Sequence, residues 1–290
     1  MKKNFGNFTR RQTLAALAGA SAAALSQARV ADNAAEGLAP PSVGAAQTRS
    51  ASGAYYACAL QFRVDAVNRD TSTAAARARM QASITRIDQQ LRGAKSWIGA
   101  DLKLVVLPEY FPVIGDEQAK LRLRERDGDG PIQGFLADAA RRHGVWLVGG
   151  TLPLFASVDD KVRNSSQVFD PQGRRVARYD KIHLFGFKKG DESYDEAATI
   201  ERGDQVVAFD TPLGRVGLGI CYDLRFPELF RAMGAVDLLV LPAAFTETTG
   251  RAHWEILLRA RAIENQCYVL AAAQGGQHPN GRMTHGNSMV

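Results

Sequence analysis

The sequence predicts an α/β protein with a substantial sheet, and three observations support this class. From residue 54 onward, short apolar runs alternate with longer amphipathic stretches. Several of the short runs are apolar on both faces, as strands between two layers must be. The 290 residues, 46% hydrophobic and 23% charged, are enough to bury a large core. This periodicity, taken alone, fits a doubly wound sheet.

The individual elements follow from the same patterns. Nine segments have the composition of strands: residues 55–62, 103–107, 145–149, 166–170, 175–179, 205–209, 216–220, 237–241 and 267–273. Four segments have helical spacing: residues 74–97, 132–143, 227–233 and 251–266. The last of these is expected to pack on a sheet through four apolar side chains: Trp254, Leu257, Leu258 and Ile263.

The net charge of +6 is concentrated at the N-terminus. Six basic and two acidic side chains lie in residues 1–50, which leaves a net charge of +2 for the other 240 residues. Such a near-neutral body lacks the basic face that phosphate binding requires, so nucleic acid is not an expected partner. Because no run of about 18 apolar residues occurs, we also expect no transmembrane helix in the mature protein.

Residues 1–28 have the pattern of an export signal. A basic start is followed by a mildly apolar stretch and by the small-residue exit Ser26-Gln27-Ala28. The adjacent Arg10 and Arg11 resemble a twin-arginine signal, although Thr13 stands where that motif prefers a bulky apolar residue. The alternative is an Ala-rich disordered extension.

Residues 29–53 are rich in Ala, Pro, Ser and Gly and are predicted to be a linker, so the fold is expected in residues 54–290. The leader predicts a periplasmic or otherwise exported protein. The alternative is a cytoplasmic one, because three cysteines without pairing or metal spacing fit a reducing compartment equally well. Cys58 and Cys267 lie in apolar runs and are interpreted as small core residues.

Three segments place a reactive side chain just after an apolar strand, where α/β folds build their sites. Glu109 follows the strand 103–107 and the strand-breaking Pro108. Lys181 follows an alternating strand and precedes apolar residues, so it is a candidate for a buried fixed charge. Read alone, each of these two side chains also fits a solvated surface position.

Cys221 lies between a glycine-containing strand and a helix that begins near Pro227. A thiol at such a turn is expected to feel the helix N-terminus, which favours thiolate and supplies free backbone N–H groups. Together the segments supply a nucleophile, a base and a cationic stabiliser. A Cys/His pair is the competing arrangement, with five candidate bases: His143, His183, His253, His278 and His285. The sequence contains no metal-binding spacing, and we expect neither a metal nor a cofactor.

Three motifs in order along the chain resemble the signatures of the nitrilase superfamily of carbon–nitrogen hydrolases: Leu107-Pro108-Glu109, Tyr179-Asp180-Lys181-Ile182-His183 and Gly219-Ile220-Cys221-Tyr222-Asp223-Leu224-Arg225-Phe226-Pro227-Glu228. Residues 249–255 and 259–269 resemble the branch that contains deaminated glutathione amidase and omega-amidase. The resemblance implies a carbon–nitrogen hydrolase domain at 54–290. It further implies an α-β-β-α sandwich that pairs through its outer helices into homodimers or larger homo-oligomers.

The resemblance also assigns roles. It implies Glu109 as the base, Lys181 as the stabilising cation and Cys221 as the nucleophile. The family's second glutamate matches Glu196, with Glu192 as the alternative. The backbone N–H of Tyr222 is expected to stabilise the oxyanion together with Lys181.

Arg225, just past the nucleophile, is a candidate for binding a substrate carboxylate, and a structural ion pair with Glu228 or another carboxylate is the alternative. The expected activity is that of a thiol amidohydrolase. It would cleave a small carboxylated amide through a Cys thioester with ammonia release, most like deaminated glutathione amidase. Omega-amidase activity on 2-oxo acid amides and a truncated, non-catalytic member are the alternatives.

The C-terminal residues depart from the family pattern. Where members often have an aromatic residue followed by Gly-His-Ser-Met, this chain has His285-Gly286-Asn287-Ser288-Met289. The family then continues with a strand, a turn, a second strand and a tail beyond the position of Val290. We therefore expect a sandwich that lacks this hairpin and tail and leaves a sheet edge uncovered.

Overall fold

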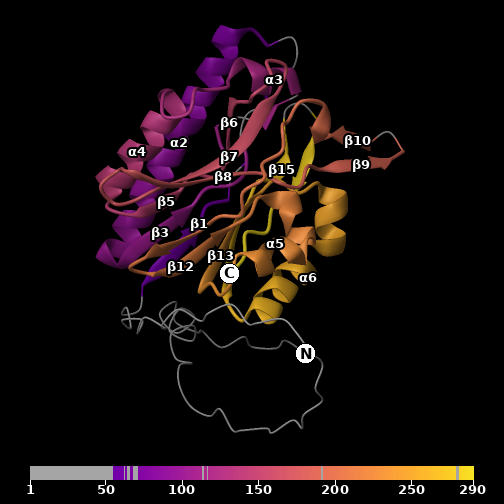
Figure 1. Ribbon diagram of the computed structural model, residues 1–290. Coiled ribbons are helices and arrows are strands. Elements are labelled where there is room, and N and C mark those ends of the chain that lie inside the picture. Colours follow the sequence, from indigo (N-terminus) through magenta and orange to yellow (C-terminus); the bar gives the residue numbers. More distant parts are fainter. Residues whose placement is uncertain are drawn as a thin grey trace, which may run out of the picture. The chain divides into compact units, whose positions relative to one another are not determined.

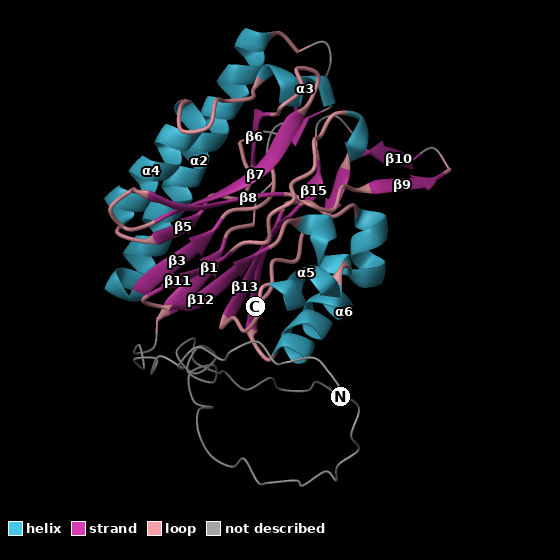
Figure 2. Ribbon diagram, in the orientation of Figure 1, coloured by secondary structure: helices cyan, strands magenta, loops and turns pink. Residues whose placement is uncertain are grey.

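Two sheets lie face to face between helices in the computed structural model (Figure 1). The structure describes residues 55–290 apart from 62, 64–65, 68–70, 113, 116, 191 and 279–280. The predictions for residues 1–28 and 29–53 lie outside the described residues. Figure 2 shows the strands in one central block with helices on both sides.

The first sheet contains four neighbouring strands in the order β1 (Tyr56–Ala59), β3 (Leu102–Val106), β5 (Trp146–Val148) and β7 (Val162–Phe169). The first three are parallel, and β7 is antiparallel to β5. Strand β7 also pairs with two antiparallel strands, β6 (Leu152–Phe155) and β8 (Arg175–Asp180). Two helices pack on the outer face: α2 (Thr73–Ile98) and α4 (Pro131–His143).

The second sheet has the order β11 (Ala208–Thr211), β12 (Gly214–Leu218), β13 (Leu238–Ala243) and β14 (Tyr268–Ala273). Strands β12, β13 and β14 are parallel, and β11 is antiparallel to β12. Two helices cover the outer face: α5 (Pro227–Ala232) and α6 (Glu247–Asn265).

The remaining elements are short. Two-stranded pairs form between β2 (Ala66–Val67) and β4 (Ile114–Gly115), between β9 (Gly186–Lys189) and β10 (Glu192–Asp195), and between β15 (Gly275–Gln277) and β16 (Met283–His285). Helix α3 spans Glu117–Arg122, and single 3₁₀ turns span Gly99–Asp101, Glu196–Ala198 and Cys221–Arg225.

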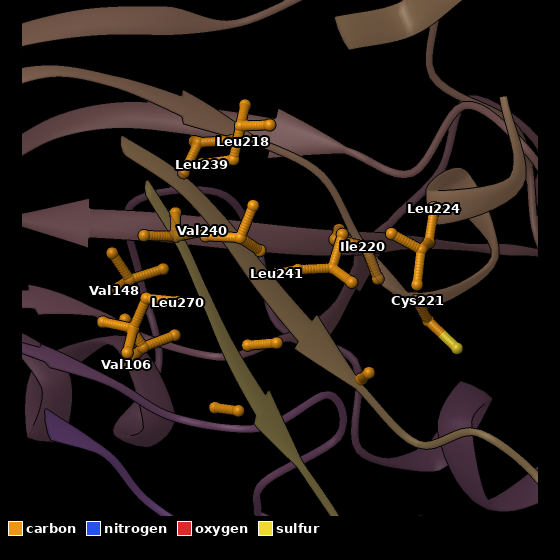
Figure 3. Packing of buried hydrophobic residues seen from close by; sticks show 14 of the residues in the cluster. Val106, Val148, Leu218, Ile220, Cys221, Leu224, Leu239, Val240, Leu241 and Leu270 are labelled. Carbon is orange, nitrogen blue, oxygen red and sulfur yellow. The ribbon is translucent and has the colours of Figure 1, made fainter. Parts of the chain in front are cut away.

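The core between the sheets follows from the alternation of side chains along each strand. In β3, Leu104 and Val106 belong to the cluster between the sheets, whereas Val105 faces the helices of the first sheet. Figure 3 shows Val106 with Leu270 of β14 in this inner cluster. Both faces of the central strands are therefore buried, which explains their continuously apolar sequences.

The predicted α-β-β-α sandwich is confirmed. Each predicted strand and helix overlaps an observed one, but the strands belong to two sheets rather than to the single doubly wound sheet that fits their periodicity. None of the helices in the described part of the chain is long and apolar enough to cross a membrane.

One predicted core residue of α6 is wrong. Trp254 and Leu258 are buried as expected, but Ile263 is 76% exposed. Arg261 is buried on the inner side instead, and its Nε donates to the carbonyl of Leu224 at 3.0 Å. The long arginine stem packs like an apolar side chain, which helical spacing of apolar residues does not reveal.

The C-terminal residues run along β14. The backbone N–H of Ala271 donates to the carbonyl of Met289 at 2.9 Å, and the N–H of Met289 donates back at 3.0 Å. The edge of β14 is thus paired at this point. The expected absence of the family's hairpin and tail stays a prediction.

Candidate active site

A cavity opens where several parallel strands end. Its wall contains ten described residues: Glu109, Phe185, Glu196, Cys221, Tyr222, Ala244, Phe245, Thr246, Thr249 and Arg282. The space is about 270 Å³ with its open mouth included. This is a small space, which suits a small substrate.

Glu109 is 2% exposed, just beyond the end of β3. Its Oε1 accepts hydrogen bonds from Nζ of Lys181 at 3.0 Å and from Nδ2 of Asn164 at 2.9 Å. Glu109 therefore follows the strand as predicted. Because its side chain is buried, the alternative of a solvated surface carboxylate is wrong. Asn164, within β7, was not predicted.

The backbone around Glu109 is clamped from the second sheet. Gln274, which is buried directly after β14, donates from Nε2 to the carbonyls of Glu109 at 2.7 Å and Tyr110 at 2.9 Å. The N–H of Tyr110 donates to the hydroxyl of Thr151 at 2.8 Å, and Tyr110 has a left-handed φ of 50°. Non-glycine residues rarely adopt this backbone conformation, and it persists only where the surroundings hold it. The hydrogen bonds from Gln274 and Thr151 therefore fix the backbone here and with it the direction of the Glu109 side chain.

Lys181 is 1% exposed and lies between two carboxylates. Besides its bond to Glu109, its Nζ donates to Glu196 Oε2 at 2.8 Å and Oε1 at 3.1 Å. Burial by itself lowers the pKa of Lys181, but the charges of Glu109 and Glu196 outweigh it and raise that pKa well above its usual value. Lys181 is therefore a permanent cation.

Glu196 also accepts from the N–H of Phe185 at 2.8 Å. Burial raises the pKa of Glu196, but the ammonium groups of Lys181 and then Lys120 prevail and lower it below its usual value. Glu196 is thus the second carboxylate, besides Glu109, that contacts Lys181. The side chain of the alternative, Glu192, lies outside the described residues.

Cys221 occupies a strained turn after β12. Its φ of 48° is left-handed, and it begins the 3₁₀ turn Cys221–Arg225. In Figure 3 its sulfur points away from the apolar cluster around Val240. Gly219, two residues earlier, packs closely, since a Cβ there would lie 3.1 Å from Leu241 and 3.3 Å from Phe230.

The expectation of a helix-stabilised thiolate is wrong. Burial and then the Glu109 carboxylate raise the pKa of Cys221 well above its usual value, although Lys181 and the N–H of Ala244 oppose them. Only a short 3₁₀ turn follows Cys221, so the helix contribution is small. At neutral pH the thiol is protonated and needs a base to react.

Asp223 ties the turn after Cys221 to the loop that holds Lys181. It is fully buried and accepts from the N–H of Ile220 at 2.9 Å and from the N–H of His183 at 3.0 Å. The hydroxyl of Tyr179 donates to it at 2.8 Å. Burial and Asp223 raise the pKa of Tyr179, which therefore stays a proton donor.

Tyr222 lies on the cavity wall directly after Cys221, but Arg225 does not line the cavity. Nη1 of Arg225 lies 3.2 Å from Nδ1 of His253, and its guanidinium lies 5.7 Å from the ring centre of Tyr222 and 5.5 Å from that of Phe245. Among the described residues, Arg225 forms no ion pair with Glu228 or with another carboxylate, and its polar contact is with His253.

The five histidines do not line the cavity. His183 contacts Asp223, His253 contacts Arg225, and His278 contacts Thr284. The other two contact Asp88 and Glu247, respectively: His143 and His285. The Cys/His arrangement is therefore not formed, and the titratable bases that share the cavity wall with Cys221 are the carboxylates of Glu109 and Glu196.

Sequence reasoning missed four residues of the site: Asn164, Gln274, Lys120 and Arg282. Asn164 belongs to a polar run that was placed before the predicted strand, and Gln274 directly follows an apolar strand. A polar residue that directly follows an apolar strand is a signal in the sequence that could have identified Gln274. The sequence contains no comparable signal for Arg282, which lies in a Gly- and polar-rich segment.

Comparison with known proteins agrees with this geometry. Residues 48–290 match the carbon–nitrogen hydrolase family model. The chain is 44% identical over 213 residues to deaminated glutathione amidase of Yersinia enterocolitica, covering 72% of this chain and 73% of that protein. It is 42% identical over 158 residues to human omega-amidase NIT2, covering 53% of this chain and 56% of that protein.

Solved structures show the same fold. Saccharomyces cerevisiae Nit3, a member of branch 10 of the nitrilase superfamily, superposes with a TM-score of 0.65 at 31% identity, covering 73% of this chain and 76% of that chain. The match supports the resemblance to the branch with deaminated glutathione amidase and omega-amidase. The chain belongs to the carbon–nitrogen hydrolase family and is a hydrolase of carbon–nitrogen bonds other than peptide bonds.

Proposed function

We propose that the protein is a thiol amidohydrolase that cleaves a small carboxylated amide through a thioester on Cys221. The observation that carries the proposal is the placement of Cys221, Glu109 and the Lys181-bound Glu196 on one small cavity. The similarity to deaminated glutathione amidase of Yersinia enterocolitica, 44% identical over 213 residues, supports this substrate class.

The proposed chemistry uses Glu109 for every proton transfer. Its carboxylate takes the thiol proton of Cys221 while the sulfur attacks the amide carbonyl carbon. Lys181 and the backbone N–H of Tyr222 stabilise the resulting oxyanion. Glu109 then returns the proton to the leaving nitrogen, the C–N bond breaks, and the amine or ammonia departs.

The thioester is hydrolysed by the same groups. Glu109 takes a proton from a water molecule, whose oxygen attacks the thioester carbonyl. The C–S bond breaks, the acid product leaves, and Glu109 returns the proton to sulfur. Glu196 keeps the ammonium of Lys181 in place and is a positioning residue.

Omega-amidase activity on 2-oxo acid amides is the second candidate. It is favoured by the similarity to human omega-amidase NIT2 and to yeast omega-amidase NIT3, the latter 35% identical over 197 residues. These activities can be separated with a panel of substrates: deaminated glutathione, 2-oxoglutaramate, asparagine-like amides and nitriles. For each compound, the product acid and the released nitrogen are measured.

Replacing the nucleophile tests the thioester. Wild-type protein mixed with a hydrolysed amide is expected to show an acyl adduct by intact-mass analysis, and Cys221→Ala is expected to show none. Cys267→Ala serves as the matched control because this half-buried thiol lies away from the cavity. A wild-type chain that stays unmodified and inactive with every amide of the panel contradicts the proposal and favours a non-catalytic member.

Removing the base has opposite effects on turnover and thiol ionisation. Glu109→Gln should lower the rate of thioester formation by about 10²- to 10⁴-fold because the proton acceptor is lost. The Glu109 charge raises the pKa of Cys221, so the same variant should shift the pH midpoint of iodoacetamide alkylation downward. Stopped-flow turnover and alkylation between pH 6 and about pH 11 measure both. An unshifted or raised midpoint argues against this electrostatic coupling.

A second copy of the chain is the proposed partner of α6. Ile256 and Ile263, seven positions apart on this helix, are 70% and 76% exposed. Exposed apolar side chains on one helix face are typical of association surfaces. Ile256→Glu is expected to convert a homodimer into monomers on size-exclusion chromatography with light scattering. The exposed Glu255→Ala is the control, and a wild-type monomer contradicts the proposal.

Export through the twin-arginine route is the proposed location. The support is the Arg10-Arg11 pair before a weakly apolar segment without acidic residues up to Asp32. That route carries folded proteins, so Cys221 would arrive already shielded in its site. Cell fractionation should find wild type outside the cytoplasm and Arg10→Lys/Arg11→Lys inside. If both versions stay in the cytoplasm and uncleaved, the export proposal is wrong and residues 1–28 are only an N-terminal extension.

A further inference from the structure

Asn164 is a buried polar residue that contacts both members of the Glu109–Lys181 pair. It lies in β7, which is paired with three other strands, and it is 1% exposed. Its Nδ2 donates to Oε1 of Glu109 at 2.9 Å, and its backbone carbonyl accepts from the N–H of Lys181 at 2.9 Å. Asn164 is not among the described residues of the cavity wall. It therefore acts on the site from behind the wall.

The amide of Asn164 is oriented for Glu109 rather than for its own hydrogen bonding. Its Oδ1 is buried and has no hydrogen-bond partner among the described residues. Burying an unpaired acceptor is unfavourable, and an apolar side chain of similar size would avoid that cost. Turning the amide over would place Oδ1 against Oε1 of Glu109, where two acceptors repel each other. The bond from Nδ2 to Glu109 is therefore the contact that this side chain serves.

The two carboxylate oxygens of Glu109 have different surroundings. Oε1 accepts from Asn164 and also from Nζ of Lys181 at 3.0 Å, whereas no donor in the described part of the chain contacts Oε2. An oxygen that accepts two hydrogen bonds, one of them from a cation, is the less basic of the two. Oε2 is thus the oxygen that is free to take a proton.

A carboxylate held by Lys181 alone would be less well defined. An ammonium group has three donors, so the carboxylate could turn and place both of its oxygens on Nζ of Lys181. Asn164 opposes this rotation by holding Oε1. Because its amide is neutral, it does so without cancelling the charge of the base, as a second cation in that position would.

The negative charge of Glu109 already acts on the thiol. Glu109 and Cys221 share the cavity wall. Burial and then the Glu109 charge raise the pKa of Cys221. A change in how the carboxylate is held should therefore be measurable at the sulfur, even in the absence of substrate.

We propose that Asn164 is a positioning residue that holds Oε1 of Glu109 and so presents Oε2 to the Cys221 thiol. In the proton transfer, the S–H bond breaks and the new O–H bond forms at Oε2. This inference rests on the proposed role of Glu109 as the base. It also states that Asn164 acts only through Glu109, so its effect should vanish in a protein that lacks this carboxylate.

A double-mutant cycle between the two residues tests the inference. Four full-length proteins are compared: wild type, Asn164→Leu, Glu109→Gln and the double variant. One measurement is the single-turnover rate at which an amide acylates Cys221. The other is the pH midpoint of iodoacetamide alkylation at Cys221, followed by peptide mass analysis, which needs no turnover. Asn164→Ala replaces the leucine variant if the latter fails to fold.

Ser166→Ala is the matched control. Ser166 lies two positions further along β7, is buried to the same extent as Asn164, and has a hydroxyl without a hydrogen-bond partner among the described residues. Its replacement tests whether any loss of a buried polar group from this strand disturbs the site, and both quantities should stay at their wild-type values.

Asn164→Leu is expected to lower the acylation rate by about 10- to 100-fold, the usual effect of a misplaced catalytic group, while the affinity for the amide stays within about twofold. The alkylation midpoint should move downward, but by less than in Glu109→Gln, because a carboxylate turned onto Lys181 exerts less of its charge on the sulfur. In the Glu109→Gln background, the same substitution should change either quantity by less than about twofold.

A rate and a midpoint equal to those of wild type in Asn164→Leu and Asn164→Ala overturn the inference. So does a double variant in which the two single effects add in full, since that result indicates a structural effect independent of Glu109. A wild type that hydrolyses no amide removes the proposed function, and the alkylation cycle then decides by itself whether Asn164 acts through Glu109. An active wild type with additive effects keeps the function and removes the inference.

Discussion

The site depends on one buried cation. Lys181 has no exposed side-chain surface, and an unpaired ammonium in that position would lose several kcal/mol of hydration. Its bonds to Glu109 and Glu196 compensate for this loss and at the same time fix the two carboxylates. Because Glu109 follows β3, Lys181 follows β8 and Glu196 follows β10, this one interaction ties three distant loops to a single point. Loss of Lys181 would leave two buried like charges facing each other.

The charge balance around Lys181 also explains why the thiol stays protonated. Two carboxylates and one ammonium leave an excess of negative charge beside Cys221, to which burial adds, so that the thiolate is disfavoured. Lys120 supplies a second positive charge toward Glu196, where it helps to keep that carboxylate ionised. In the proposed mechanism, the nucleophile is thus formed only when Glu109 accepts the thiol proton. A thiol kept neutral between turnovers is also less open to oxidation, since the thiolate is the reactive form.

Much of the fold was accessible from sequence because strands and helices leave local patterns, but their assignment to layers was not. Val106 and Leu270 share one core although 164 positions separate them, and no local pattern records which strands face each other. Glu109, Lys181 and Cys221 could be placed because each follows a strand that the sequence predicts. Asn164 and Arg282 could not, since their importance comes from distant partners, and Ile263 was misplaced because the stem of Arg261 occupies the inner side of the helix.

The turn that carries Cys221 is supported from the outer layer as well as from the site. A Cβ at Gly217 would come within 2.7 Å of Met233 and 2.9 Å of Leu239, so the glycine lets the segment after α5 pack directly on β12. Asp223 also accepts a hydrogen bond from the N–H of Ile220 at 2.9 Å, directly before Cys221. A left-handed φ at a non-glycine residue costs of order 1–3 kcal/mol, and it persists only where packing determines the backbone on both sides. Packing within the sandwich therefore sets the direction of the Cys221 sulfur. The charged side chains of Glu109, Lys181 and Glu196 set the electrostatic environment of that sulfur.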